Sequence, residues 1–304
     1  MAEIEIWRGS VATWECDAMG HLNVAFYVAK SMEGLGALAA ELGMPGAFGP
    51  AATSTLVVRE QHIRFLREAR PNAPLSMTGG VVTLGESDAR ILLLMRHASG
   101  ELAATFSTLV SHVTSDEVRA FPWPERVRAR AQDLAVNVPP EAAARSVSLD
   151  PIETQASLAR ADALGMPRTG LRLLGVGDCD AFGRMRPEIM MHRLSDGVPH
   201  VFSGLRDTQA PGAARIGGAV LEYRLIHHAW PRAGDRLELR SGVAGGDRRI
   251  RRLVHWLLDP DSGKPWGSAE AIAISLDLEA RKIIPLSDDD VARTEAVAIK
   301  GLGL

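Results

Sequence analysis

The sequence has little of what marks several large classes of protein. Its two cysteines, Cys16 and Cys179, are too few for a disulfide scaffold, so we expect a reducing compartment. No apolar run approaches the roughly 18 residues that a membrane-spanning helix needs. The first residues also lack a basic region leading into an apolar stretch. We therefore expect a cytoplasmic protein without a membrane span.

The sequence has no large excess of charge of one sign, and it lacks the common cofactor-binding motifs. The formal net charge is −3 at pH 7, which gives no global reason to expect nucleic acid. No Gly-x-x-x-x-Gly-Lys loop, dinucleotide fingerprint or Gly-x-Ser-x-Gly elbow occurs. His227, His228 and His255 have no acidic or cysteine partners at metal-ligand spacing. These absences predict a protein with no nucleic acid partner, no cofactor and no metal.

The hydrophobic pattern of the first half favours an α+β fold. With 304 residues, 46% of them hydrophobic, the chain can form one large domain or two of ordinary size. A strand is expected over residues 3–14, with Trp14 among its apolar positions, and a helix over residues 23–42. Further strands are expected over residues 55–66, 75–84, 89–98 and 101–114, followed by a basic helix over residues 122–134. This order predicts one helix packed on an antiparallel sheet.

The second half of the sequence repeats the first. Residues 14–20 reappear at residues 177–183 at an offset of 163 residues, the difference between Asp17 and Asp180. Residues 62–71 align with residues 222–231 at nearly the same offset. A nearly constant offset over a whole domain indicates tandem duplication. We therefore predict domains over residues 1–135 and 152–304, joined by a linker over residues 136–151, that form an internal pseudo-dimer.

The two copies differ at three motif positions. Where the first copy has His21, Asn23 and Tyr27, the second has Arg184, Arg186 and Met190. Pro187 takes the first position of the second helix, and Pro199 is expected to stop or kink that helix. The second site is therefore predicted to be altered or lost.

Asp180 persists in the second copy beside two arginines. Arg184 and Arg186 are candidate substrate-binding residues, because guanidinium groups favour an anion such as a phosphate or a carboxylate. They would also stabilise the Asp180 carboxylate and weaken it as a base. The alternative is that both arginines are surface charges. Asp180 is thus a candidate second site that binds an anionic group or only braces the pseudo-dimer.

In the first copy, a carboxylate, an imidazole and an amide precede the expected helix. This combination is a plausible acyl-transfer site, because acyl transfer needs a group that activates a nucleophile or attacks, and a place for negative charge on the carbonyl oxygen. Asp17 can supply the first, and the unpaired N–H groups at the helix start can supply the second. Simpler roles stay open: Asp17 as a turn or capping acid, Asn23 as the N-cap, and His21 as a turn histidine.

Gly20 and Tyr27 complete the candidate site. Gly20 allows close approach of the backbone to a substrate. Tyr27 lies one turn into the expected helix, either at the pocket wall or half-buried in the core. His21 could orient the substrate or hold Asp17 in place.

The run Asp17-Ala18-Met19-Gly20-His21-Leu22-Asn23, with Tyr27, resembles the Asp-x-x-Gly-His-x-Asn…Tyr signature of hotdog-fold acyl-thioesterases. That group contains 4-hydroxybenzoyl-CoA thioesterase and the related acyl-ACP thioesterases. The resemblance implies two tandem hotdog domains, each an antiparallel sheet wrapped around a central helix, with acyl sites at their interface. It also implies that Asp17 is the nucleophile or general base, and that the backbone N–H groups of Asn23 and Val24 polarise the thioester carbonyl.

Together these observations predict hydrolysis of an acyl-CoA or acyl carrier protein thioester without a cofactor. The thioester is the expected partner, and a homodimer of two pseudo-dimers stays open. One alternative is a hotdog-fold enoyl-thioester hydratase or dehydratase, which would normally need a histidine–acid pair across the interface. The other is a non-catalytic protein that binds acyl thioesters.

Overall fold

The computed structural model describes residues 4–202 and 216–304, which form two compact units. The first unit comprises the residues up to Ala144 together with Val176–Met191. The second unit comprises Arg145–Gly175 and the residues from His192 onward. The loop of the second copy that carries Asp180 therefore belongs to the first unit, and the domain limits expected from the repeat stay a prediction.

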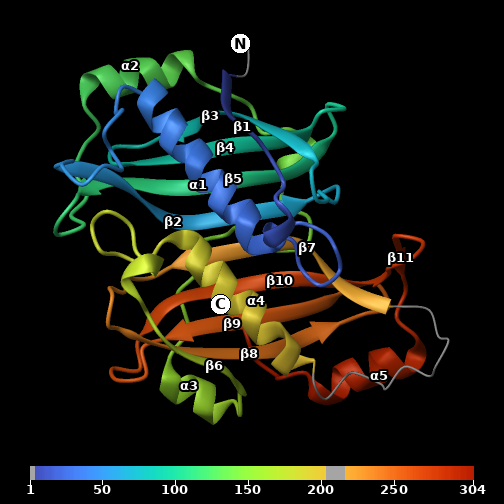
Figure 1. The fold of residues 1–304 in the computed structure, drawn as a ribbon. Coiled ribbons are helices and arrows are strands. Elements are labelled where there is room, and N and C mark those ends of the chain that lie inside the picture. Colours follow the sequence, from blue (N-terminus) through green and yellow to red (C-terminus); the bar gives the residue numbers. More distant parts are fainter. Residues whose placement is uncertain (1–3, 203–215) are drawn as a thin grey trace. The chain divides into compact units, whose positions relative to one another are not determined.

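The first unit is an antiparallel sheet with α1 (Val24–Glu41) lying across its strands, as Figure 1 shows. The strand order is β1-β3-β4-β5-β2. The strands are β1 Ile4–Ser10, β2 Ser54–Phe65, β3 Pro74–Leu84, β4 Asp88–His97 and β5 Leu102–Thr114, and α2 (Glu125–Asp133) follows them. The expected helix and the four strands after it are confirmed to within one residue at each end.

The strand expected over residues 3–14 is shorter than predicted, and its first residue lies outside the described part of the chain. After β1 ends at Ser10, a short 3₁₀ turn spans Thr13–Glu15. The Glu15 carboxylate accepts the Ala12 N–H at 2.8 Å and closes this turn. Trp14 therefore points to solvent, 83% exposed, and its expected place on the strand was wrong.

A glycine lets α1 approach the sheet closely. Val28, Leu35 and Leu38 on α1 are fully buried, as their three- and four-residue spacing predicts. At Gly34 an added Cβ would lie 2.7 Å from Met77 Sδ. A larger residue at position 34 would therefore push the helix away from the sheet.

The second unit has the same architecture. Its strands are ordered β7-β10-β9-β8-β6, with β11 paired to β10. The strands are β6 Arg168–Leu173, β7 Ile216–His227, β8 Arg236–Gly246, β9 Arg251–Leu258, β10 Pro265–Asp277 and β11 Lys282–Ile284, and the helices include α3 Leu158–Ala163 and α5 Asp288–Val297. The helix α4 (Pro187–Val201) begins in the first unit and continues into the second. Pro199 lies inside α4, which ends two residues later at Val201, so this proline does not itself end the helix, and a kink there stays a prediction.

The two copies share local irregularities as well as the order of their elements. The pairing of β1 shifts register between Glu5 and Trp7, and that of β6 shifts between Arg168 and Gly170, 163 residues later. Gly197 stands on α4 where Gly34 stands on α1, and a Cβ there would lie 2.5 Å from Leu239 Cδ2. Such matched details confirm the double hotdog fold.

Two buried histidines lie in the second unit. His227 and His255 are 5% and 0% exposed, and the His255 Nδ1 lies 2.8 Å from Ser241 Oγ. Burial lowers the pKa of each imidazole from 6.5 to about 4. Both rings are therefore neutral in the folded protein near pH 7.

We expect Gly34→Leu to lower the free energy of unfolding by about 1–3 kcal/mol, because its side chain meets the sheet. Gly36→Leu is the matched control on the same helix. A Cβ at Gly36 has its nearest atom, in the Phe48 ring, at 3.8 Å, so this change should cost nothing. Urea unfolding of both variants checks the claim, and equal losses would contradict it.

Stability should also fall as the pH drops from 6.5 towards 4. The unfolded chain binds protons on His227 and His255 in this window, whereas the folded chain does not. The expected loss between pH 7 and pH 5 is roughly 2 kcal/mol per histidine. His255→Leu should remove about half of this pH dependence in urea unfolding. An unchanged slope would show that His255 is protonated in the folded state.

Candidate active site

The loop from Asp17 to His21 is a closed turn held by its own backbone. The Asp17 N–H donates to the His21 carbonyl at 2.9 Å, and the Gly20 N–H donates to the Asp17 carbonyl at 3.0 Å. Gly20 has a φ of 77°, which residues with a Cβ rarely adopt. An added Cβ at Gly20 would meet no atom within 4 Å, so the turn is also open on that side.

The Asp17 carboxylate is held on both oxygens. Oδ1 accepts the Met19 N–H at 2.8 Å, and Oδ2 lies 3.2 Å from His21 Nδ1. The side chains of Asp17 and His21 are 22% and 14% exposed, so a small reactant could reach the acid. Among the described residues nothing partners the buried His21 Nε2. The arrangement favours a positioning role for His21.

The start of α1 offers one backbone donor where two were expected. Asn23 is the N-cap, because its side-chain oxygen accepts the Ala25 N–H at 2.9 Å. The Asn23 N–H itself donates to the Glu15 carbonyl at 2.9 Å, which rules it out as an oxyanion donor in this structure. In the described part of the chain, the Val24 N–H has no acceptor.

Tyr27 lies in the core. It is 4% exposed, its hydroxyl oxygen accepts the Ala69 N–H at 3.2 Å, and its ring meets Phe65 edge-on at 5.1 Å. Burial raises the pKa of its phenol. Of the two places that the sequence left open for Tyr27, the structure therefore has the core, and contact of Tyr27 with substrate stays a prediction.

Sequence reasoning missed an ion pair behind the loop. Lys30 Nζ lies 2.7 Å from Glu15 Oε1, with both side chains largely buried. Because Glu15 also accepts the Asn23 N–H on its carbonyl, the pair ties the 3₁₀ turn to α1. Lys30 was overlooked because it lies off the apolar spacing of the helix and because lysine is rarely buried.

The second copy builds the same turn with a different side-chain partner. The Asp180 N–H donates to the Arg184 carbonyl at 2.7 Å, and Gly183 has a φ of 77°. Asp180 Oδ1 accepts the backbone N–H groups of Phe182 and Arg184, both at 2.9 Å. Oδ2 receives Arg184 Nε and Nη2, both at 3.1 Å. The Asp180 carboxylate is therefore fully occupied.

The two arginines of this loop are used internally. Arg184 is 2% exposed and pairs with Asp180. Arg186 donates to the Gly177 carbonyl at 3.0 Å and lies 3.0 Å from Glu188. Neither arginine presents an unoccupied guanidinium group to solvent, which weakens their assignment to substrate binding.

Two cavities lie elsewhere. One, of about 440 Å³ in the first unit, is lined by the apolar loop over residues 43–54 together with His112 and Arg126. The other, of about 200 Å³, lies in the second unit between α4, β6 and β8. Neither is lined by Asp17, His21 or Asn23.

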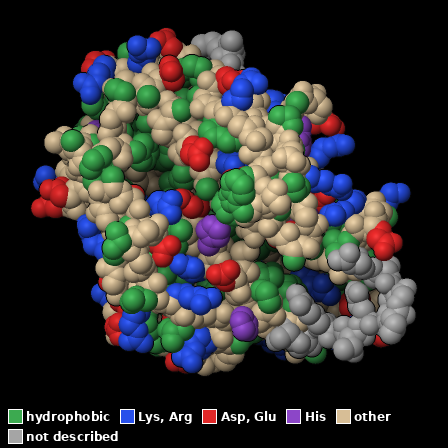
Figure 2. All heavy atoms as spheres, in the orientation of Figure 1, with side chains coloured by type: hydrophobic (Ala, Val, Ile, Leu, Met, Phe, Trp, Pro, Cys, Tyr) green, Lys and Arg blue, Asp and Glu red, His purple; other side chains and the backbone are tan. Residues whose placement is uncertain are grey.

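Surface charge is mixed. On the face drawn in Figure 2, basic and acidic side chains are intermingled. Within the described residues, no helix is long and apolar enough to span a membrane.

Comparison with known proteins places both halves of the chain in one group. The model of the thioesterase-like superfamily matches residues 11–131 and again residues 174–294. Betainyl-CoA thioesterase of Pseudomonas aeruginosa is 29% identical over 143 residues, which are 45% of this chain and 89% of that protein. This relative therefore has about the length of one repeat.

Solved structures match over both repeats. An acyl-ACP thioesterase from Bacteroides thetaiotaomicron has a TM-score of 0.63 at 10% identity, covering 88% of this chain and 96% of its own. The 12:0-ACP thioesterase from Umbellularia californica has a TM-score of 0.65 at 13% identity, covering 88% and 92%. These similarities bear out the fold.

Removing the buried lysine should be costly. We expect Lys30→Met to lower the free energy of unfolding by about 3–5 kcal/mol, because it leaves the Glu15 carboxylate without its partner. Adding Glu15→Gln should recover part of the loss. Arg67→Met, which breaks an exposed pair with Glu101, should cost less than about 1 kcal/mol. Urea unfolding measures these losses. A Lys30→Met loss as small as that of Arg67→Met would show that the Glu15–Lys30 pair does not stabilise the fold.

Proposed function

Because the chain belongs to the thioesterase-like superfamily and is a thioester hydrolase, we propose that it cleaves acyl-CoA or acyl carrier protein thioesters at the Asp17 loop. Asp17 acts as general base or nucleophile, His21 positions it, and the Val24 N–H stabilises the oxyanion. The observation that carries this assignment is the contrast between the two copies of one turn.

Asp17 has the contacts that a catalytic carboxylate needs. One backbone N–H and one imidazole fix its orientation, and no arginine or lysine forms an ion pair with it among the described residues. As a base it would take a proton from a water that attacks the thioester carbonyl carbon. As a nucleophile it would form an acyl anhydride that water then hydrolyses. Either route releases the free acid and the thiol.

The negative charge that develops on the carbonyl oxygen needs a donor. The first helical residue, Val24, supplies an N–H without an acceptor at the positive end of an 18-residue helix. Asn23 supports this donor indirectly, since its side chain caps the Ala25 N–H and fixes the helix start. Removing one such donor typically costs about 10²–10³ in rate.

The second copy lacks both features. The Arg184 side chain and two backbone N–H groups occupy the Asp180 carboxylate. Pro187 stands where Val24 stands, and a proline nitrogen carries no hydrogen. Asp180 therefore stabilises the turn that contains it, and Asp17 carries out the hydrolysis.

The names of the relatives support the proposed class of substrate. The Pseudomonas aeruginosa relative is named for a CoA thioester, and the two structural neighbours are named for acyl carrier protein thioesters. The Gly20 turn gives the acyl carbonyl room to approach the backbone, because nothing lies within 4 Å of an added Cβ there.

We expect Asp17→Asn to lower kcat for thioester hydrolysis by about 10²–10⁴-fold, because asparagine keeps the shape but cannot accept the proton. Thiol release from a panel of acyl-CoA and acyl carrier protein thioesters measures it. Asp180→Asn is the matched variant and should retain most of the activity. The reverse ranking would place the working site in the second copy.

The same assay separates the alternative functions. A hydratase would consume an enoyl thioester without releasing thiol, and a binding protein would retain the thioester intact. Either result with wild-type protein over the whole panel would overturn the proposal.

A further inference from the structure

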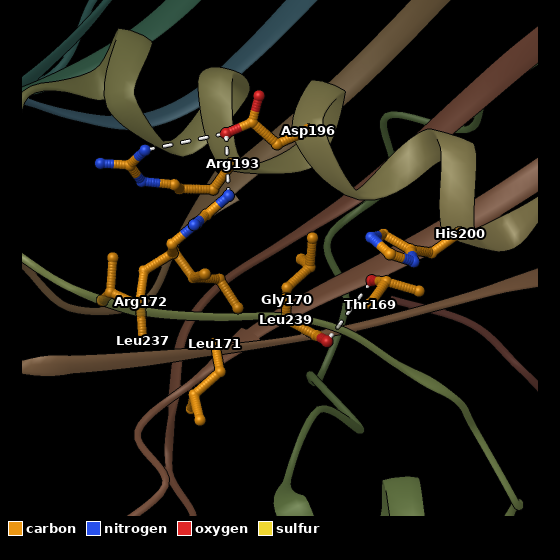
Figure 3. A pocket seen from close by; sticks show the side chains of 10 residues that line it. Thr169, Gly170, Leu171, Arg172, Arg193, Asp196, His200, Leu237 and Leu239 are labelled. Atoms are coloured by element: carbon orange, nitrogen blue, oxygen red, sulfur yellow. Dashed lines mark hydrogen bonds and ion pairs between the residues drawn. The ribbon is translucent and has the colours of Figure 1, made fainter.

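The cavity in the second unit has a mixed lining, shown in Figure 3. Arg193, Asp196 and His200 reach it from α4. Thr169 and Gly170 border it from β6, and Leu239 from β8. Its volume is about 200 Å³.

The first unit carries a large aromatic side chain at the position that corresponds to Gly170. Trp7 stands in β1 where Gly170 stands in β6, 163 residues later, next to the same register shift. The Trp7 indole N–H donates to Glu33 Oε2 at 2.5 Å, and Lys30 Nζ lies 5.3 Å from the ring centre. The ring also covers Gly9, where an added Cβ would lie 2.7 Å from it. An acidic side chain, a basic side chain and the backbone at Gly9 therefore contact the indole.

The second unit has residues of the same charge at the positions of the two polar partners of that indole. Asp196 stands at the position of Glu33, and Arg193 at the position of Lys30, both at the offset of 163 residues. Both line the cavity. The second copy therefore keeps the acid and the cation that surround an indole but has glycine where the indole is attached.

We propose that this cavity binds a flat bicyclic aromatic ring that carries an N–H donor. Asp196 accepts the ring N–H, as Glu33 does from Trp7, and Arg193 lies over the ring as Lys30 does. The site lies wholly in the second unit and does not depend on the assignment of Asp17.

The size and the remaining lining suit such a ligand. Apolar cavities of about 150 Å³ in other proteins bind benzene, so about 200 Å³ accommodates a larger ring. Leu237, Leu239 and Leu257 supply apolar walls. Arg172 stands at the position of Gly9. Its Nη2 lies 3.9 Å from Asp196 Oδ2, so its guanidinium can stack on a ring that is bound beside Asp196.

Calorimetric titration with indole tests the proposal, with benzofuran as the matched probe that has the same shape but no N–H. Wild-type protein should bind one indole saturably, and benzofuran about tenfold more weakly because Asp196 gains no hydrogen bond. Asp196→Asn, on an exposed part of α4, should reduce this preference.

Gly170→Trp should abolish indole binding, because the new tryptophan side chain would itself occupy the cavity. A Cβ at Gly170 would lie 3.2 Å from Leu239 Cβ, a tight contact, but Trp7 is accommodated opposite Met77 in the same register. Trp7→Gly should conversely add a second indole site. No saturable binding to the wild type, or equal binding to Gly170→Trp, would overturn the proposal.

Discussion

The hydrogen bond from a loop N–H to an aspartate carboxylate is the interaction on which both copies depend. It runs from Met19 to Asp17 in the first copy and from Phe182 to Asp180 in the second. A glycine with positive φ follows each time and reverses the chain into a central helix. Because the turn fixes where that helix begins, it also fixes where the first unpaired N–H points. In our proposal, small changes around this structural turn make one of its two copies catalytic.

Two differences distinguish the turn that we propose to be catalytic from its copy. The first is the partner of the second carboxylate oxygen: an imidazole leaves Asp17 partly available, whereas the Arg184 guanidinium occupies Asp180. The second is the residue that begins the helix, which brings an N–H in one copy and none in the other. In our proposal one turn is sufficient for hydrolysis, so duplication relaxes the demands on each copy. The copies also differ at Gly170, which has no side chain where the first copy has the Trp7 indole and which borders the cavity beside α4.

Periodicity predicts elements better than it predicts contacts. The helix over residues 23–42 and the strands after it follow from apolar spacing and turn residues, and the repeat follows from its nearly constant offset. Trp14 was misplaced because a local carboxylate closes a turn there, and the choice between pocket wall and core for Tyr27 depends on tertiary packing. The Glu15–Lys30 pair could not be foreseen, because two residues of opposite charge 15 positions apart meet only once the helix is docked. Which backbone N–H lacks an acceptor is likewise a property of the folded loop.

The central proposal is that the Val24 N–H, one of these two differences, is needed for hydrolysis by the first copy. Val24→Pro removes that hydrogen at a position where helices accept proline, and Asn23 already has the extended conformation that precedes proline. The most direct measurement is kcat for thiol release by Val24→Pro beside Val24→Ala, which keeps the N–H. The account predicts that Val24→Pro loses about 10²–10³-fold in kcat with an unchanged urea midpoint, while Val24→Ala stays near wild type. Equal rates for the two variants would contradict it.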